Sequence, residues 1–348
     1  MSTLTPELDA PARLPELFEA PPMDPLFVEG VPALAARDSG ILELGRWLQA
    51  LDYRFTTPTP DTHRRVNLRA ACEEAMELRD VFGWSRRFRA GLLPAAAIRW
   101  LDEAAALGAE DGWFRSRLRF STLDDLTLVH SAWPTLAPDS VFFGPDTYRF
   151  ATLIRSALES CAEAPRSIVD IGCGTGAGGL LAARQLAPAQ PRVVLADINP
   201  QALRLARINA RLAGVPAECV LSDVLGSVPG EFDLVLANPP YLADPAARVY
   251  RDGGGHLGSG LSLRIVAEGL QQLAPDGRLV LYTGSAIVGG RDLLREGLEP
   301  LLQSAQVSWD YRELDPDVFG EELDQPAYRT VERIAAVGLI VTAPGAAT

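Results

Sequence analysis

From residue 139 onward, short apolar runs alternate with longer segments of helical periodicity. The apolar runs predict strands at residues 167–170, 193–197, 219–222, 232–237, 278–283, 307–311 and 333–341. The segments between them predict helices at residues 177–186, 200–213, 261–274 and 292–303. Such alternation is typical of a mainly parallel sheet with helices on both faces, so we expect an α/β fold.

The chain before this alternation has a different pattern. Residues 1–30 are rich in proline and acidic residues, and we expect a flexible N-terminal segment there. Apolar residues then recur at helical spacing, which predicts helices at about residues 41–51, 62–82 and 95–107. A β-hairpin follows, with strands at residues 114–120 and 126–130. We therefore expect a mostly helical recognition domain over residues 31–138 and a second domain over residues 139–348.

The composition narrows the class of protein. A net charge of −13 and a pI near 4.8 argue against broad, non-specific binding to nucleic acid. The most apolar stretch, residues 334–341, is too short to cross a bilayer, and the N-terminus lacks the features of a secretory signal. All 32 basic residues are arginine, as in proteins from GC-rich bacterial genomes, and the four cysteines are scattered without a CxxC pair. We expect a cytoplasmic bacterial protein without a metal site, a disulfide or a membrane partner.

A glycine-rich turn, Asp-Ile-Gly-Cys-Gly-Thr-Gly, follows the first predicted strand. Glycine lets the backbone approach a ligand, and the next helix N-terminus offers free N–H groups to a carboxylate. The spacing G-x-G-x-G differs from the G-x-G-x-x-G of dinucleotide sites, and the acidic residue before it can bind an ammonium group. The turn thus favours an adenosyl cofactor. The residues that we expect at this cofactor site are Asp170, Gly172, Cys173, Gly174 and Gly176.

Acidic residues follow the next two predicted strands. Asp197 ends the second strand, where a carboxylate can accept hydrogen bonds from both ribose hydroxyls. Asp223 follows the third strand and can accept from an adenine amino group, while Ile198 and Val224 would cover the faces of the ring. A nicotinamide cofactor also uses an acid at the second strand, so Asp197 indicates an adenosine-containing ligand without separating the two cofactor classes.

The motif Asn-Pro-Pro-Tyr at residues 238–241 follows the fourth predicted strand and therefore lies at the same sheet edge as the glycine-rich turn. Pro239 and Pro240 fix the backbone and remove two N–H donors. This leaves the Asn238 side-chain oxygen and the Pro239 carbonyl as acceptors for one –NH2 group, and Tyr241 can stack on a planar group. Together with the adenosyl site, the motif predicts methyl transfer from S-adenosylmethionine to a planar nitrogen, through positioning and pre-aligned dipoles.

Residues 141–341 resemble the class I methyltransferases of the protein-glutamine N5 type, the release-factor methylases, which share Asn-Pro-Pro-Tyr with adenine-N6 methyltransferases. The matching stretches are residues 170–176, Asp197, Asp223, residues 238–241 and residues 258–264. The resemblance implies a Rossmann-like, seven-stranded fold, S-adenosylmethionine as cofactor, and Asn238, Pro239 and Tyr241 around the accepting nitrogen. Residues 143–147 occupy the place of a proline-containing segment in that family, but the residues differ.

The predicted reaction is compatible with several classes of acceptor. The resemblance and the acidic composition favour a protein glutamine side chain; an adenine of RNA or DNA, a small molecule, and a non-enzymatic cofactor-binding scaffold are the alternatives. Nucleic acid would bind through an arginine belt, although the same arginines could instead pair with neighbouring acids on solvated faces. The arginine belt consists of Arg64, Arg65, Arg69, Arg86, Arg87, Arg89, Arg99, Arg115, Arg117 and Arg119.

Overall fold

The computed structural model describes residues 36–244, 248 and 250–345, so the prediction for residues 1–30 lies outside the described chain. Within the described residues, the central sheet has seven strands in the order β11–β12–β9–β8–β5–β6–β7, with a short β10 paired to β9. The five neighbouring strands β9, β8, β5, β6 and β7 are parallel to one another, whereas β12 and β11 are added at one edge in antiparallel orientation. The strands are β5 (Ser167–Ile171), β6 (Arg192–Asp197), β7 (Glu218–Leu221), β8 (Phe232–Ala237), β9 (Leu273–Val288), β10 (Arg291–Asp292), β11 (Ser308–Asp315) and β12 (Arg333–Thr342).

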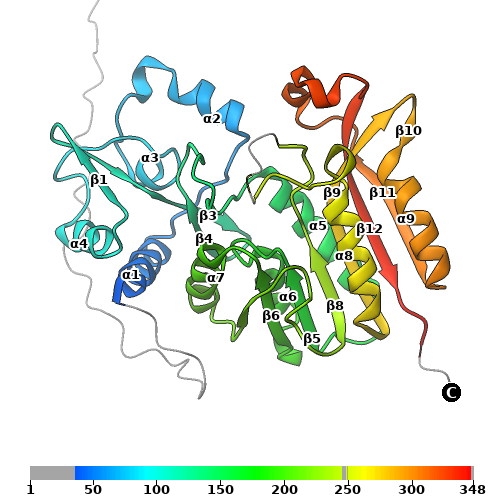
Figure 1. The fold of residues 1–348 in the computed structure, drawn as a ribbon. Helices are drawn as coiled ribbons and strands as arrows, with labels where there is room; N and C mark the ends of the chain where they lie inside the picture. Colours follow the sequence, from blue (N-terminus) through cyan, green and yellow to red (C-terminus); the bar gives the residue numbers. More distant parts are fainter. Residues whose placement is uncertain (1–35, 245–247, 249, 346–348) are drawn as a thin grey trace, which may run out of the picture.

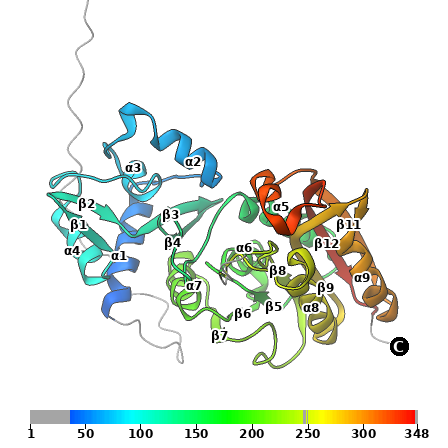
Figure 2. The same cartoon turned by 45° about the horizontal axis from the view of Figure 1, so that its top comes forward.

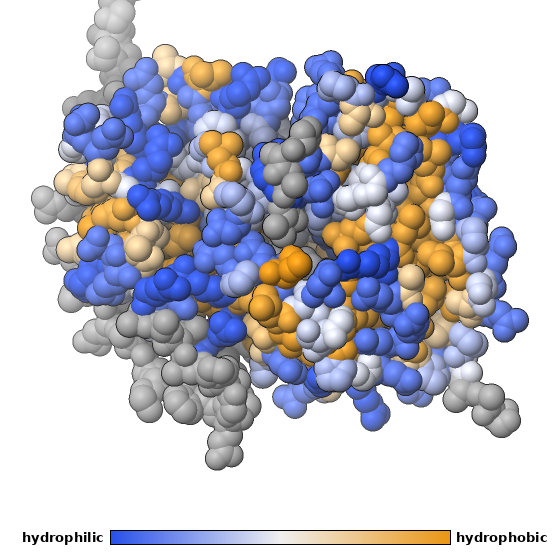
Figure 3. Space-filling model, viewed as in Figure 1, coloured by the Kyte–Doolittle hydropathy of each residue, from blue (hydrophilic) through white to orange (hydrophobic). Residues whose placement is uncertain are grey.

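Helices cover both faces of this sheet (Figure 1). One face carries α5 (Pro145–Glu159), α6 (Ala177–Gln185) and α7 (Pro200–Ala213), and the other carries α8 (Gly260–Gln271) and α9 (Leu293–Ser304). Successive strand residues point to opposite faces, so in β5 Ile168 packs with the first group of helices and Val169 with the second. In the space-filling view, apolar residues gather on the side of α8 and α9 (Figure 3). The predicted α/β fold, with its mainly parallel sheet, is confirmed.

Two elements of this half differ from the prediction. Strand β9 begins at Leu273, within the segment assigned to the preceding helix, and continues to Val288 because β12 pairs with it along ten residues. Helix α5 is absent from the predicted elements. Its first turn carries polar residues, Asp146, Thr147 and Arg149, and the first two are buried, so the apolar period that marks a helix is interrupted there.

The N-terminal part of the described chain is built from short helices and two antiparallel strand pairs (Figure 1). The predicted helix at residues 62–82 is interrupted, because α2 ends at Asn67, whose side chain donates to the Trp84 carbonyl at 2.9 Å. The predicted helix at residues 95–107 ends at Glu103. The helices are α1 (Ala36–Ala50), α2 (Pro60–Asn67), η1 (Ala70–Cys72), α3 (Leu78–Phe82) and α4 (Ala95–Glu103).

The prediction of one hairpin at residues 114–130 is wrong in part. The predicted first strand is interrupted at Arg117, because the Arg117 backbone N–H donates to the Ala106 carbonyl at 2.8 Å. As a result, residues on the two sides of Arg117 pair with different neighbours. The two pairs are β1 (Leu107–Glu110) with β2 (Trp113–Ser116), and β3 (Leu118–Leu123) with β4 (Leu126–Ser131).

The N-terminal part packs against α7, which lies between it and the sheet (Figure 2). Four apolar residues of α7 join its core: Ala202, Leu205, Ile208 and Leu212. Asn209, which is fully buried on the same helix, accepts from the Val129 N–H at 2.8 Å and donates to the Val129 and Thr175 carbonyls at 3.0 and 2.9 Å. This side chain joins β4 directly to the turn that follows β5.

Candidate active site

A cavity of about 380 Å³ opens at the edge of the sheet where β5, β6 and β8 end. Parallel strands present their carboxyl ends at one edge, so motifs that lie far apart in the sequence meet there. The predicted residues that line it are Asp170, Gly172, Cys173, Gly174, Asp197, Ile198, Asp223, Val224, Asn238, Pro239, Pro240 and Tyr241. Gly176 lies behind this lining at the N-cap of α6, where an added Cβ would be 3.1 Å from the Leu195 side chain.

The turn after β5 presents bare backbone to the cavity. Gly172 and Gly174 adopt φ values of 61° and 55°, in the left-handed region that strains residues with a side chain. An ideal Cβ on either glycine would meet no atom within 4 Å, so the space beside them is open. A ligand can therefore approach the main chain closely at this turn.

Asp170 is the most strongly perturbed carboxylate of the cavity. It is almost fully buried at the end of β5, and one oxygen accepts from the Gly179 N–H at 2.8 Å. Burial raises the pKa of Asp170 to about 7, and the hydrogen bond from Gly179 offsets only part of this effect. A cationic group in the cavity would restore the charged form, so the site suits an ammonium ion.

The carboxylate of Asp197 accepts more hydrogen bonds from backbone N–H groups than that of Asp170 does. Asp197 accepts from the Gly174 N–H at 2.8 Å and from the Asn199 N–H at 2.8 Å, which ties the ends of β5 and β6 together. Burial nevertheless raises its pKa. Beside it, Ile198 leaves 54% of its surface exposed, an unusual state for a large apolar residue, and it faces the cavity. Asp223 pairs with Arg264 at the far end of the same cavity.

The Asn-Pro-Pro-Tyr motif leaves β8 at the other side of the cavity. Asn238 is half-buried, and its side-chain amide has no hydrogen-bond partner within the described chain, so both of its polar atoms are available to a ligand. Tyr241 is held firmly: its hydroxyl donates to Asp146 at 3.0 Å, and its ring lies over Gly284. Burial, followed by the Asp146 charge, raises the pKa of Tyr241 well above its usual value.

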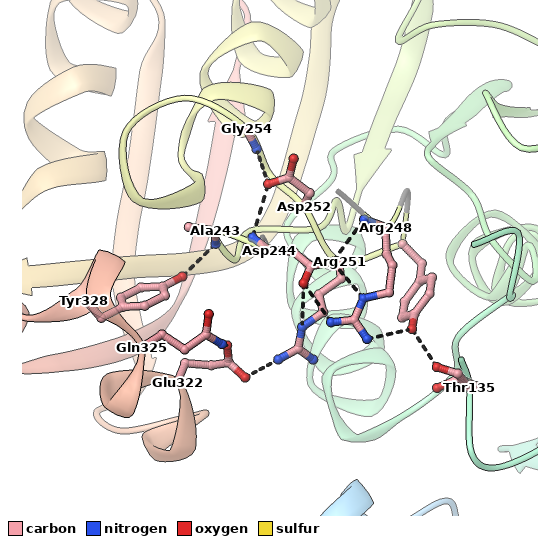
Figure 4. A network of polar contacts seen from close by, with 11 residues as sticks. Thr135, Ala243, Asp244, Arg248, Arg251, Asp252, Gly254, Glu322, Gln325 and Tyr328 are labelled. Atoms are coloured by element: carbon pink, nitrogen blue, oxygen red, sulfur yellow. Dashed lines mark hydrogen bonds and ion pairs between the residues drawn. The ribbon is translucent and has the colours of Figure 1, made fainter. Parts of the chain in front are cut away.

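Charged side chains hold the described residues of the segment that follows the motif (Figure 4). Asp244 binds the guanidinium of Arg248 through two bonds of 2.7 Å and also faces Arg251, which pairs with Glu322 near the C-terminal end of the described chain. The Tyr250 hydroxyl donates to the Thr135 carbonyl at 2.6 Å. These contacts join the N-terminal part, the described residues after the motif and the segment η4 (Gly320–Asp324) around one side of the cavity.

The N-terminal part supplies one wall of the cavity, formed by residues outside the predicted site. Its lining residues are Pro60, Trp133, Pro134, Thr135 and Leu136. Leu136 is 71% exposed beside the cavity. An aromatic, proline-containing segment between the hairpin and the first strand is the one signal in the sequence that could have pointed to this wall. Asp146 and Phe142 also line the cavity without having been assigned.

None of the three histidines, all of which lie in the described chain, lines the cavity. Burial lowers the pKa of His63 to about 3 and that of His130 well below its usual value, so both are neutral at physiological pH. His256 is exposed in η3 (His256–Gly258). Gly258 in the same turn packs against main chain, since an added Cβ there would lie 2.2 Å from the Tyr241 carbonyl oxygen.

Much of the arginine belt is paired locally. Arg64 and Arg65 bind Asp61 at 2.7 and 2.6 Å, and Arg86 binds Asp80 in a pair that is largely buried. Two further members, Arg87 and Arg89, lie over the Trp113 ring at 4.3 and 3.4 Å from its centroid. The ion pairs neutralise part of the positive charge of the arginine belt locally, which leaves less of it for a polyanion.

Comparison with known protein families matches residues 150–298 to the methyltransferase small domain. Among curated proteins, the release factor glutamine methyltransferase of Deinococcus radiodurans is 38% identical over 141 residues, which cover 37% of this chain and 50% of that protein. A putative protein N5-glutamine methyltransferase of Methanocaldococcus jannaschii is 32% identical over 149 residues, covering 41% of this chain and 73% of that protein. The ribosomal RNA small subunit methyltransferase C of Serratia proteamaculans is 28% identical over 162 residues, which cover 41% of this chain and 46% of that protein.

The chain spans about half the length of several curated relatives that it matches. Among solved structures, a methyltransferase from Pyrococcus furiosus has a TM-score of 0.41 at 16% identity, over 59% of this chain and 89% of that one. The Trm5b structure from Pyrococcus abyssi has a TM-score of 0.45 at 14% identity, over 68% of this chain and 62% of that one. Within the described residues, no helix is long and apolar enough to span a bilayer.

Proposed function

Because this chain belongs to the class I S-adenosylmethionine-dependent methyltransferases, we propose that it transfers a methyl group from S-adenosylmethionine to a planar nitrogen. One observation carries this proposal: the glycine-rich turn, both acidic strand ends and the Asn-Pro-Pro-Tyr motif line the same cavity. The volume of about 380 Å³ lies in the range of small-molecule sites.

The residues at the ends of β5 and β6 fit the cofactor. Asp170 would hold the methionine ammonium, since its buried carboxylate gains most from a positive partner. The open backbone at Gly172 and Gly174 would lie against the cofactor, Asp197 would accept from the ribose hydroxyls, and the exposed face of Ile198 would cover the adenine. When bound, S-adenosylmethionine supplies a methyl group that its sulfonium has already activated.

The residues after β8 would hold the acceptor. The Asn238 side-chain oxygen and the Pro239 carbonyl would accept the two hydrogens of one –NH2 group, which turns the nitrogen lone pair toward the cofactor side of the cavity. The backbone that carries both oxygens is restricted before the acceptor arrives, because Asn238 and Pro239 each precede a proline, so the two acceptors favour the positive charge that develops on nitrogen with little reorganisation. Tyr241 would flank the planar group.

For the acceptor we propose the amide of a glutamine side chain in a protein. The glutamine methyltransferases among the relatives support this choice, as does the net charge of −13. The wall formed by Trp133 to Leu136 would give the N-terminal part, residues 31–138, its role in recognising the polypeptide. A mouth with an exposed Leu136 suits an apolar contact with a peptide chain.

A base nitrogen of a nucleic acid, such as adenine N6, is the second candidate. The match to ribosomal RNA small subunit methyltransferases is the observation that favours it. Two aromatic rings that line the cavity, Phe142 and Tyr250, stack at 6.4 Å and could extend a stack with a base. The local pairing of the arginine belt counts against it.

The test uses purified protein, radiolabelled S-adenosylmethionine and a bacterial lysate separated into protein, nucleic-acid and small-molecule fractions. We expect label in protein, removed by protease and located on glutamine by mass spectrometry. The matched control is Asn238→Ala, which should abolish labelling while cofactor binding persists. If nuclease releases the label, the acceptor is a base nitrogen rather than glutamine. Label only in the small-molecule fraction would reject both acceptors. A wild-type signal no higher than that of Asn238→Ala would reject the proposed reaction.

A further inference from the structure

The Tyr241 ring sits in a tight seat formed by three residues from distant parts of the chain. One face lies over Gly284 of β9, where an added Cβ would come within 2.2 Å of the ring. Phe319 meets the ring edge-on, with centroids 5.8 Å apart and planes at 71°. The hydroxyl donates to an oxygen of Asp146 at 3.0 Å. Of these contacts, the last is the only one that is directional and charged.

Several further contacts hold the Asp146 side chain in place. Pro145 opens α5, so Asp146 lies in the first helical turn, where the free N–H groups of the helix favour a negative charge. Its second oxygen accepts from the fully buried Tyr282 hydroxyl at 2.7 Å. Arg149, one turn along α5, pairs with Asp146 at 3.2 Å and with Asp315 at 2.8 Å. Asp146 is itself 8% exposed, and it lines the cavity.

We infer that Asp146 is a positioning residue for methyl transfer: its carboxylate fixes the Tyr241 ring at the place where that ring flanks the acceptor nitrogen. This inference rests on the proposed function, because it assigns to Asp146 an effect on turnover through Tyr241. The bond from Tyr241 has a buried carboxylate as its acceptor, and a charged acceptor makes a hydrogen bond stronger than a neutral one does. The ring is thereby held by its far end as well as by its packing on Gly284.

Helix α5 links this bond to the N-terminal part. Two residues beyond Asp146, the Tyr148 hydroxyl accepts from the Thr57 N–H at 3.1 Å, so the same turn of α5 contacts both regions. The position of Asp146, and through it that of Tyr241, is therefore set by elements on both sides of the cavity. A residue with this placement can transmit a change in the N-terminal part to the acceptor site.

The test is a double-mutant cycle between Asp146→Asn and Tyr241→Phe, measured with the acceptor found in the labelling experiment. We expect Asp146→Asn to lower kcat at least about tenfold while the Kd for S-adenosylmethionine changes less than twofold. In the Tyr241→Phe background the same change should lower kcat less than twofold, since the bond through which Asp146 acts is already gone. Equal decreases in both backgrounds, or an unchanged kcat in Asp146→Asn, would overturn the inference.

If Asp146→Asn does not fold, two further variants test the same inference. Tyr241→Phe removes only the bond to Tyr241 and should lower kcat about tenfold, whereas Tyr282→Phe removes the other bond and should lower it less than threefold. The reverse order, or equal effects, would contradict the inference. Both variants keep the Asp146 carboxylate, and circular dichroism with urea denaturation establishes that each is folded before the kcat values are compared.

A spectroscopic readout separates this inference from the proposed reaction. In protein labelled at tyrosine Cζ, the resonances of Tyr241 and Tyr282 should move in Asp146→Asn, whereas that of Tyr311, whose hydroxyl donates to Asp292 at 2.7 Å, should not. A wild-type protein that transfers no methyl group would defeat the proposed function and leave this measurement valid. A Tyr241 resonance that does not respond to Asp146→Asn would show that the bond does not hold the ring, whatever the enzyme does.

Discussion

Replacing Gly284 by alanine should displace the Tyr241 ring without removing any polar group of the site. The new Cβ would lie 2.2 and 2.4 Å from two ring carbons, whereas ordinary contact begins at 3.4 Å, so the ring must retreat by about 1 Å. A misplacement of about 1 Å at a reacting centre can cost on the order of a hundredfold in rate. We therefore expect kcat to fall about a hundredfold, with the Kd for S-adenosylmethionine within threefold of wild type.

The assay is methyl transfer with radiolabelled S-adenosylmethionine, and the Kd is measured by calorimetry. The control is Gly320→Ala, since a Cβ there meets no atom within 4 Å and the backbone has no positive φ, so this variant should match wild type. Overpacking costs about 1–3 kcal/mol of stability, which chemical denaturation would report separately. Turnover in Gly284→Ala within threefold of wild type would refute the reasoning that the ring position controls the reaction.

Three further predictions concern the acceptor, the cofactor and the core. Asn238→Ala should lower methyl transfer at least about a hundredfold, equivalent to roughly 2.7 kcal/mol, while calorimetry still detects cofactor binding; unchanged turnover would remove Asn238 from the mechanism. Because the pKa of Asp170 is raised to about 7, the carboxylate becomes protonated as the pH falls through 7, and an ammonium then loses its partner. The affinity for S-adenosylmethionine should therefore fall on the order of tenfold between pH 7.5 and 5.5, and an equal fall in Asp170→Asn would assign the effect to another group. Asn209→Ala should lower the free energy of unfolding by about 3–5 kcal/mol, because three buried backbone groups lose a partner; urea denaturation showing a loss under 1 kcal/mol would contradict this.

The sheet and its site were predictable because their signals are local. A strand such as β8 is a continuous apolar run, and the turns after β5 and β8 carry glycine or proline at positions where the backbone demands them. Since parallel strands bring their ends to one edge, the sequence order alone indicates that Asp170, Asp197 and Asn238 are neighbours. Their meeting around one cavity required no knowledge of long-range packing.

Contacts between distant residues were not predictable in this way. Asp146 binds tyrosines 95 and 136 residues away, and nothing in its surroundings besides a proline at a helix start marks it. The interruption after α2 depends on Asn67 reaching the Trp84 carbonyl, a contact that a helical period cannot reveal. The interruption at Arg117 likewise depends on its hydrogen bond to Ala106, which the alternating pattern of residues 114–120 does not reveal.

Helix α5 and Asn209 also determine whether the two parts of the described chain could be exchanged separately. The stretch that matches the family begins at residue 150, inside α5 and after Asp146 and Tyr148. Exchanging everything before that point would remove the Tyr241 anchor, leave the Asn209 amide without two of its three bonds, and expose the apolar face of α7 to water. The two parts are therefore not interchangeable modules, and a chimera joined at residue 150 should lose stability together with the Tyr241 anchor.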